Sequence, residues 1–134
     1  VEIGMLSVEN GDWDQLQQDA RLIRELVFIV EQNIPEQDEW DDQDAISQHF
    51  VVYDRDQPVA TARLLQNNSV GRVAVIQKYR GQGIGKALIQ DLVDTGKTCG
   101  WSRLYWHTRT ENPARKLYDG FTPADDYVRY RMTL

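Results

Sequence analysis

The residues with the clearest potential for chemistry lie in segment 80–85, which reads Arg-Gly-Gln-Gly-Ile-Gly. The apolar run 73–76 before this loop suits a buried strand, and Ile84, Leu88 and Leu92 recur after it at helical spacing. Alternating glycines at a strand-to-helix junction let the backbone approach a bound group closely. The amide hydrogens at the start of a helix also attract negative charge. The loop therefore predicts a cradle for an anion, and phosphate is the anion we expect.

Two common phosphate-binding motifs do not fit this spacing. A nucleotide P-loop places Ser or Thr after its Gly-Lys pair, whereas Lys86 is followed by Ala87, which has no hydroxyl for a magnesium ion. A dinucleotide fingerprint requires Gly-x-Gly-x-x-Gly. Counted from Gly81 its last position is Lys86, and counted from Gly83 it is Leu88. The loop is therefore neither of these two sites.

Arg80, Gly83 and Gly85 do fit an Arg/Gln-x-x-Gly-x-Gly/Ala motif that follows a Val-x-Val strand. This stretch closely resembles the pyrophosphate-binding motif of the GNAT superfamily of N-acetyltransferases. The resemblance implies an α/β fold with a mixed α+β sheet, of about six strands and about four helices, whose central parallel pair splays apart. It also implies acetyl-CoA as co-substrate, with its pyrophosphate at the loop amides and its pantetheine arm along a bulged strand. A glycine-rich turn without a ligand is the alternative.

The residues that the resemblance assigns to the cofactor lie on the strand, in the loop, at the helix start and on a later helix. They are Val73, Ala74, Val75, Arg80, Gly81, Gln82, Gly83, Ile84, Gly85, Lys86, Asn112 and Tyr118. Acyl transfer to an amine further requires a neutral amine, a donor for the oxyanion and a proton for the departing thiolate. By resemblance, the oxyanion donor is the backbone amide of Val75.

Tyr118 is the candidate general acid. The segment 114–118 resembles a second family motif, Asn-x-x-Ala-x-x-Leu-Tyr, whose Tyr hydroxyl lies near the sulfur of CoA. A phenol that titrates near 10 stays protonated at neutral pH and can supply a thiolate with a conjugate-acid pKa near 8.5. A helical Tyr packed on the core is the alternative. Asn112 stands one residue closer to Tyr118 than the family spacing requires, which leaves Glu111 at the nominal position.

Glu31 is the candidate that binds the amine or accepts its proton. It lies in Arg24-Glu-Leu-Val-Phe-Ile-Val-Glu-Gln32, which resembles a bacterial GNAT branch in which the first two helices form the acceptor wall. An ordinary carboxylate at a helix end is the alternative. His107, at the end of a predicted strand, is the other titratable group. Cys99 is expected at the far end of the cofactor helix, which argues against a covalent intermediate.

Composition limits the functional classes. The 134 residues fit a single domain, 1–134, and carry a net charge of -6. Nucleic-acid binding is disfavoured because it needs a basic face. Segment 31–54 has no Lys or Arg but many Asp and Glu, so it either attracts a cationic partner such as an amine or is a solvated loop. The apolar runs are too short for a membrane span, and the first residues lack the features of a signal peptide. Cys99 is the only cysteine, which predicts no metal site and a cytoplasmic setting.

The remaining pattern predicts the elements that position these residues. Strands are expected at 3–8, 50–53, 58–65, 70–76, 101–107 and 127–134, with an antiparallel meander over the second to fourth. Helices are expected from Asp12 as cap to about Glu31, after Pro35, from Gly83 to about Gly100, and over 111–118. On the first helix, Leu16, Ala20, Ile23, Val27 and Val30 mark the apolar face, and Arg24 lies mostly off it.

This pattern and the resemblance together predict a cytoplasmic N-acetyltransferase that moves an acetyl group from acetyl-CoA directly to a primary amine. The expected acceptor is a small molecule such as a polyamine, an amino acid or an aminated metabolite, with a peptide or protein amine as second choice. Two other classes stay open: a non-catalytic acyl-CoA-binding sensor, and a structural protein that docks partners on the acidic segment. A homodimer is common among similar proteins.

Overall fold

The computed structural model describes residues 5–100, 103–107, 118–121 and 129–133. These residues form one mixed sheet with six strands in the order β1-β2-β3-β4-β5-β6. Each neighbouring pair is antiparallel except β4 and β5, which run parallel. The strands are β1 (Leu6–Gly11), β2 (Gln48–Asp54), β3 (Gln57–Leu64), β4 (Ser69–Val75), β5 (Arg103–His107) and β6 (Arg129–Thr133).

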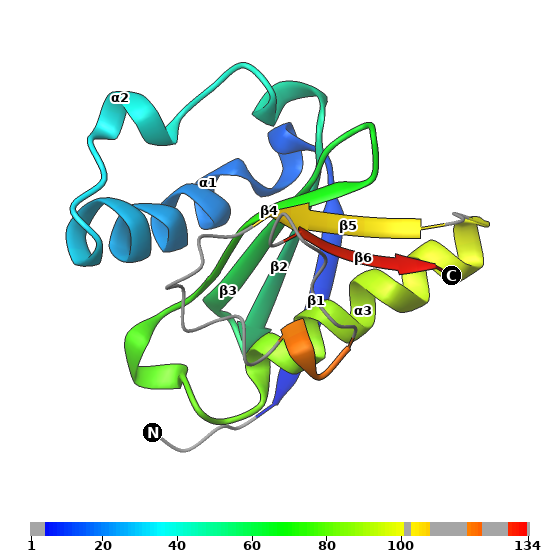
Figure 1. Cartoon of the computed structure of the whole chain (residues 1–134). Helices are drawn as coiled ribbons and strands as arrows, with labels where there is room; N and C mark the ends of the chain where they lie inside the picture. The colour runs from blue at the N-terminus through cyan, green and yellow to red at the C-terminus, as the bar shows by residue number, and fades with distance from the viewer. Residues whose placement is uncertain (1–4, 101–102, 108–117, 122–128, 134) are drawn as a thin grey trace.

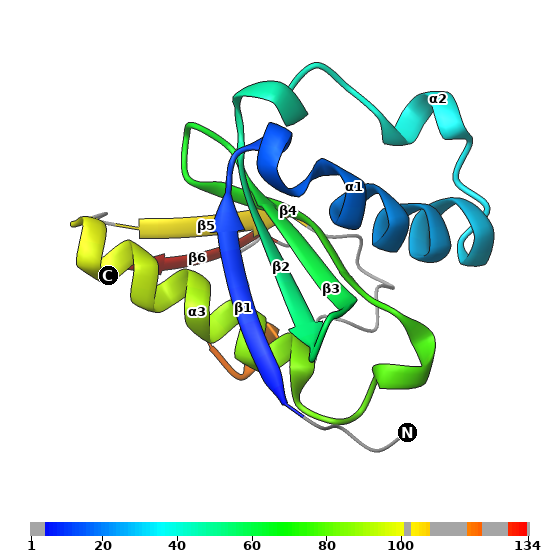
Figure 2. The same cartoon turned by 180° about the vertical axis from the view of Figure 1, so that it is seen from behind.

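The helical elements connect these strands and cover both faces of the sheet. They are α1 (Trp13–Arg24), a π-helix (Glu25–Glu31), α2 (Glu36–Glu39), two short 3-10 turns (Asp44–Ile46 and Gln77–Tyr79) and α3 (Ile84–Cys99). Figures 1 and 2 show α1 and α3 on opposite sides of the strands. Most residues of β2 and β3 are buried regardless of which face they occupy, because both helices pack against these two strands.

Helix α1 shows both a confirmed prediction and two wrong ones. Asp12 caps it as predicted, with its carboxylate accepting a hydrogen bond from the Gln15 amide at 2.9 Å. The helix then widens into the π-helix, where the Gln32 amide bonds the Val27 carbonyl five residues back at 3.1 Å. This changes the direction of later side chains, so Val30 is 63% exposed and was wrongly placed on the apolar face. Arg24 is 1% exposed, so it is buried rather than off that face.

The expected fold is confirmed in its main features, with small shifts of boundary. The antiparallel meander is formed by β2, β3 and β4, and α3 ends at Gly100 in the left-handed conformation, as predicted. The last predicted helix, over 111–118, lies outside the described residues except for Tyr118. Tyr118 and Asp119 are described, and both are helical. None of the helices in the described part of the chain has the length and apolarity that a membrane crossing requires.

Candidate active site

The predicted anion cradle lies between the end of β4 and the start of α3. Gly81 and Gly83 have φ angles of 75° and 81°, a conformation that favours glycine. Gly83 is the N-cap of α3 and supplies no side-chain cap, and the first helical bond runs from the Ala87 amide to the Gly83 carbonyl at 3.0 Å. The amides just before Ala87 are therefore not used by the helix itself, so they can bind an anion.

The space around this loop fits a bound group. A Cβ atom added at Gly81 or Gly83 would meet no heavy atom within 4 Å, so backbone conformation rather than crowding accounts for these glycines here. Ile84 is buried at 1% exposure and offers only its backbone to a ligand. Gln82 and Lys86 are exposed beside the loop, and Gly85 is half-buried. The cradle thus has open space, unused amides and a nearby Lys86 ammonium, which suits a diphosphate.

Strand β4 separates from β5 after its first residues. Among the described residues, the two strands pair only at Ser69 with Tyr105 and at Val70 with Trp106. The register between β3 and β4 shifts by one residue between the Arg63–Gly71 pair and the Thr61–Ala74 pair, which is a β-bulge. This geometry confirms the splayed parallel pair that the sequence led us to expect.

The peptide group of Val75 faces the opening between the two strands. The Ile76 amide donates to the Val59 carbonyl of β3 at 3.0 Å. Because successive residues of a strand direct their backbone groups to opposite edges, the N–H and C=O of Val75 point away from β3. The Val75 carbonyl accepts a bond from the Arg80 Nε at 2.9 Å, which agrees with this direction. The Val75 N–H is therefore on the side where an acyl group could lie, as are the backbone groups of Val73.

The loop between β4 and the cradle is fixed by a buried contact. Tyr79 is 4% exposed and its hydroxyl donates to the Asp54 carboxylate at 3.1 Å, at the end of β2. Burial and this bond to a carboxylate raise the pKa of the Tyr79 phenol. The contact joins the loop before the cradle to the end of β2.

Two predicted site residues meet in one ion pair. The Arg80 guanidinium donates Nη1 and Nη2 to the two oxygens of the Glu31 carboxylate at 2.6 and 2.7 Å. Both side chains are about one-third exposed, at 39% for Arg80 and 34% for Glu31. The hydrogen bond from Arg80 and its positive charge lower the pKa of Glu31. Glu31, at the end of the π-helix, therefore lies next to the cradle and is ionised at neutral pH.

The structure places the other predicted residues less completely. Tyr118 is 4% exposed and belongs to the hydrophobic core cluster, so its ring packs in the interior. Asn112 lies outside the described residues. His107 ends β5, and its side chain is not among those described. Cys99 is exposed at the last residue of α3, at the opposite end from the cradle.

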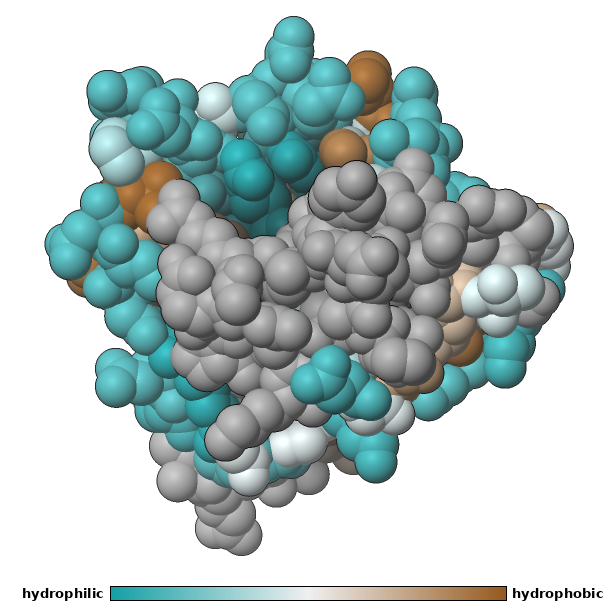
Figure 3. Space-filling view, in the orientation of Figure 1, coloured by the Kyte–Doolittle hydropathy of each residue, from teal (hydrophilic) through white to brown (hydrophobic). Residues whose placement is uncertain are grey.

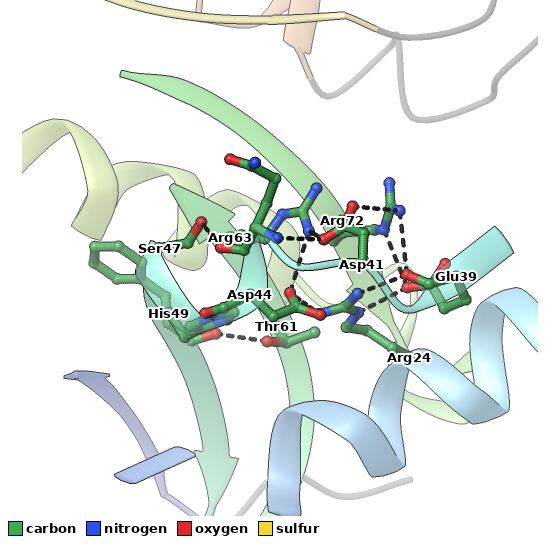
Figure 4. Close-up of polar contacts among 11 residues, drawn as sticks. Arg24, Glu39, Asp41, Asp44, Ser47, His49, Thr61, Arg63 and Arg72 are labelled. Carbon is green, nitrogen blue, oxygen red and sulfur yellow. Dashed lines mark hydrogen bonds and ion pairs between the residues drawn. The ribbon is translucent and has the colours of Figure 1, made fainter. Parts of the chain in front are cut away.

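A buried ion network beside this site was not predicted. Arg24 of α1 is 1% exposed and bonds Glu39 through Nε at 2.7 Å and Asp44 through Nη1 at 2.8 Å. Its guanidinium also lies 5.0 Å from the Trp40 ring centre. Figure 4 shows that the network continues to two further arginines from the sheet. Arg24 was wrongly placed off the buried face because charged partners, not apolar ones, cover it.

The two further arginines pair with the same acidic segment. Arg63 of β3 bonds Asp41 at 2.7 Å and Asp44 at 3.2 Å. Arg72 of β4 lies 3.1 Å from Glu39 and 3.6 Å from Asp41. For Glu39 and Asp44, both interpretations of the segment were wrong, because these two carboxylates are 2% and 3% exposed and pair with arginines inside the fold. Asp41 pairs with Arg63 as well, but its side chain is 35% exposed. The signal in the sequence was an arginine within a largely apolar strand, as at Arg63 and Arg72, whereas Arg24 lies in a mostly polar helix and gave no such signal.

A surface depression lies away from the cradle. It has a volume of about 510 Å³ and is lined by residues of β1, α1, β2 and the turn after β2, including Glu9, Gln15 and Tyr53. None of the predicted site residues lines it. It is open and polar, and it lacks the unused helix amides of the cradle, so we assign the candidate site to the cradle. In the described part of the chain, no three His, Cys, Asp or Glu side chains come together to hold a metal ion.

Comparison with known proteins agrees with this geometry. The model of the acetyltransferase (GNAT) family matches residues 13–121. YjcF of Bacillus subtilis, named an uncharacterized N-acetyltransferase, is 32% identical over 96 residues, which cover 69% of each chain. A solved protein of Lactobacillus plantarum has a TM-score of 0.81 at 22% identity, over 98% of this chain and 99% of that chain. An acyl-CoA N-acyltransferase of Pseudomonas aeruginosa has a TM-score of 0.78 at 24% identity, over 96% of this chain and 100% of that chain.

Proposed function

Because the chain belongs to the GNAT acetyltransferase family, we propose that it transfers the acetyl group of acetyl-CoA directly to the primary amine of a small molecule. Polyamines, amino acids and aminated metabolites are the acceptors we expect. One observation supports this proposal most: Arg80, at the start of the cradle loop, donates a hydrogen bond at 2.9 Å to the Val75 carbonyl, on the edge of β4 that does not pair with β3. A diphosphate and a reacting carbonyl can thus be held by one continuous stretch of backbone.

Two residues of this chain then have separate roles in acyl transfer. Bound acetyl-CoA supplies a thioester whose carbonyl carbon is open to attack by an amine nitrogen. The Val75 N–H donates to the carbonyl oxygen while the C–N bond forms and the C–S bond breaks. The Tyr118 hydroxyl gives its proton to the departing sulfur, and the amine loses a proton to water, which restores the phenol through solvent.

Glu31 suits the binding of the amine better than the removal of its proton. Arg80 lowers the pKa of this carboxyl, which makes it a weaker base and a constant negative charge at neutral pH. The lone pairs of this carboxylate that Arg80 leaves unused can accept hydrogen bonds from a cationic amine before the amine loses its proton. Glu36, Asp38 and Asp42 are exposed on the segment that follows, and the described part of the face in Figure 3 is mostly hydrophilic. These features support a polar, cationic acceptor.

Release of free thiol from acetyl-CoA across a panel of amines tests this proposal. The panel contains polyamines, amino acids and a peptide with a free N-terminus, and a thermal-shift titration with CoA runs beside it. We expect CoA to raise the melting temperature and at least one small amine to release thiol. Stabilisation by CoA with no acetylated amine would support a non-catalytic sensor. An unchanged melting temperature at saturating CoA would contradict both. A cytoplasmic location and a monomer or homodimer complete the proposal.

A further inference from the structure

Arg72 has a backbone conformation that its residue type rarely adopts. Its φ angle is 51°, in the left-handed region that favours glycine. Among the described residues, three other non-glycine positions share this sign: Asn33, Arg55 and Asn68. Asparagine adopts this region more readily than most residues, and Arg55 lies in the exposed turn between β2 and β3. Arg72, in contrast, lies inside a strand, so something must hold it there.

The side chain of Arg72 supplies that hold. Its Nε lies 3.1 Å from the Glu39 carboxylate, and its Nη2 donates to the Glu39 carbonyl at 3.2 Å. The same Nη2 lies 3.6 Å from Asp41. Glu39 is 2% exposed and is itself fixed by Arg24 at 2.7 Å. Figure 4 shows this chain of contacts from α1 through the acidic segment to β4. Arg72 is thus held to a buried partner by an ion pair at Nε and a hydrogen bond at Nη2.

The anchored residue is part of the bulge that shapes the cleft. The register shift between β3 and β4 spans Gly71 to Ala74, and in the part of the chain that the structure describes β4 pairs with β5 only before this shift. An extra residue in a strand changes which edge each later peptide group faces. The cleft-facing direction of the Val73 and Val75 amides therefore depends on the bulge at Arg72. Resting on the function proposed above, we propose that Arg72 is a positioning residue, which sets the cofactor-facing backbone of β4 through its ion pairs with Glu39 and Asp41.

Arg55 offers a matched control for this inference. It is the same residue type with almost the same φ, 58°, but it lies in an exposed turn. We compare Arg72→Ala and Arg72→Gly with Arg55→Ala and Arg55→Gly. Alanine removes the side-chain anchor and keeps the backbone penalty, whereas glycine removes both. An anchor that holds a strained bulge predicts a larger defect for Arg72→Ala than for Arg72→Gly.

Two measurements read the outcome independently. The first is hydrogen exchange in ligand-free protein, over a peptide that spans 69–76. We expect exchange there to rise at least tenfold in Arg72→Ala, three- to tenfold in Arg72→Gly because the anchor is lost there too, and less than twofold in either Arg55 variant. The second is steady-state kinetics, where Arg72→Ala should lower kcat for the best amine at least tenfold and weaken CoA binding by a smaller factor. A purely structural role would instead raise exchange across the whole sheet and leave kcat of the folded fraction unchanged.

The result that would overturn the inference is wild-type exchange over 69–76 in Arg72→Ala together with wild-type kcat. If Arg72→Ala does not fold, Arg72→Gly is used as the test variant. Exchange over 69–76 and kcat that are both within twofold of wild type in Arg72→Gly would then overturn the inference. The exchange result does not depend on activity. Wild-type protein that neither binds CoA nor releases thiol would reject the proposed function, whereas an active wild type with an indifferent Arg72 rejects only the inference.

Discussion

At the scale of single residues, the Glu31–Arg80 pair joins two residues that the sequence analysis placed in different parts of the site, the acceptor wall and the cofactor loop. Arg80 marks the start of the cradle, and Glu31 was expected on the acceptor wall, yet their side chains are joined by two short hydrogen bonds. The two residues are 49 positions apart in the sequence, and no local sequence pattern predicts a contact between them. The pair places a charged acceptor group next to the cofactor loop, so both substrates would meet beside Arg80.

Replacing Glu31 by Gln tests whether it binds the amine. The amide keeps the shape and one acceptor for Arg80 but removes the negative charge, so a cationic amine loses its attraction. We expect the KM for the amine to rise roughly tenfold, equivalent to about 1.4 kcal/mol, with kcat changed much less. Glu36→Gln, an exposed carboxylate of α2, is the control. A large fall in kcat at unchanged KM would show instead that Glu31 removes the proton.

Replacing Tyr118 by Phe tests the general acid. The ring that packs in the core is retained, so the fold should be preserved, while the proton for the departing sulfur is lost. We expect kcat to fall by about a hundredfold or more, with CoA affinity within a few fold of wild type. Single-turnover acetylation and CoA titration measure the two quantities. Unchanged turnover would remove Tyr118 from this role and leave it as a core residue.

At the scale of elements, the parts set by local chemistry could be predicted and the parts set by distant contacts could not. The cap at Asp12, the left-handed stop at Gly100 and the loop at Gly83 follow from short-range residue preferences. The π-helix over Glu25–Glu31 has no comparable signal in the sequence. The bulge at Arg72 could not be predicted from the sequence either. Arginine is not a residue type that favours a left-handed backbone, and the residue that anchors it, Glu39, is 33 positions away.

The two ends of α3 allow a controlled test of the cradle. Gly83 and Gly100 flank the helix, both are left-handed, and neither has an atom within 4 Å of an added Cβ. A valine at either position incurs a backbone penalty of about 1–2 kcal/mol or more, since L residues disfavour this conformation. We expect both variants to lose similar stability in urea unfolding.

Only Gly83→Val should lose CoA binding, by at least tenfold in a calorimetric titration, because its side chain would enter the space of the diphosphate. Gly100→Val, at the far end of the helix, should bind CoA as the wild type does. Equal affinity in the two variants would be incompatible with the cradle.

At the scale of the whole molecule, the two long helices could be predicted because apolar periodicity indicates burial, and the meander because short turns join its strands. The internal ion network could not be predicted, because acidic residues are expected at the protein surface when their arginine partners are not known. The network also determines how the fold responds to acid. His49 lies beside it, 1% exposed, with its Nε2 bonded to the Asp44 carbonyl at 2.9 Å.

The stability of the fold should therefore fall in mild acid. Burial lowers the pKa of His49 below its usual 6.5, so the unfolded chain takes up a proton at a pH where the folded chain does not. Stability is fully present above pH 6.5 and is lost as the pH falls through this value. The slope contributed by one such group is at most about 1.4 kcal/mol per pH unit. Urea unfolding between pH 7.5 and 5.5 should show a smaller slope in His49→Gln, and equal slopes would contradict this cause.

The most direct test of the central claim is a crystal structure of the protein with acetyl-CoA bound. We predict that the diphosphate lies against the amides of 81–85 at the start of α3, with the thioester oxygen within hydrogen-bond distance of the Val75 N–H. Tyr118 should lie beside the sulfur. A coenzyme bound elsewhere, such as in the depression lined by Glu9, Gln15 and Tyr53, with the cradle unfilled, would contradict the assignment of this site and the mechanism built on it.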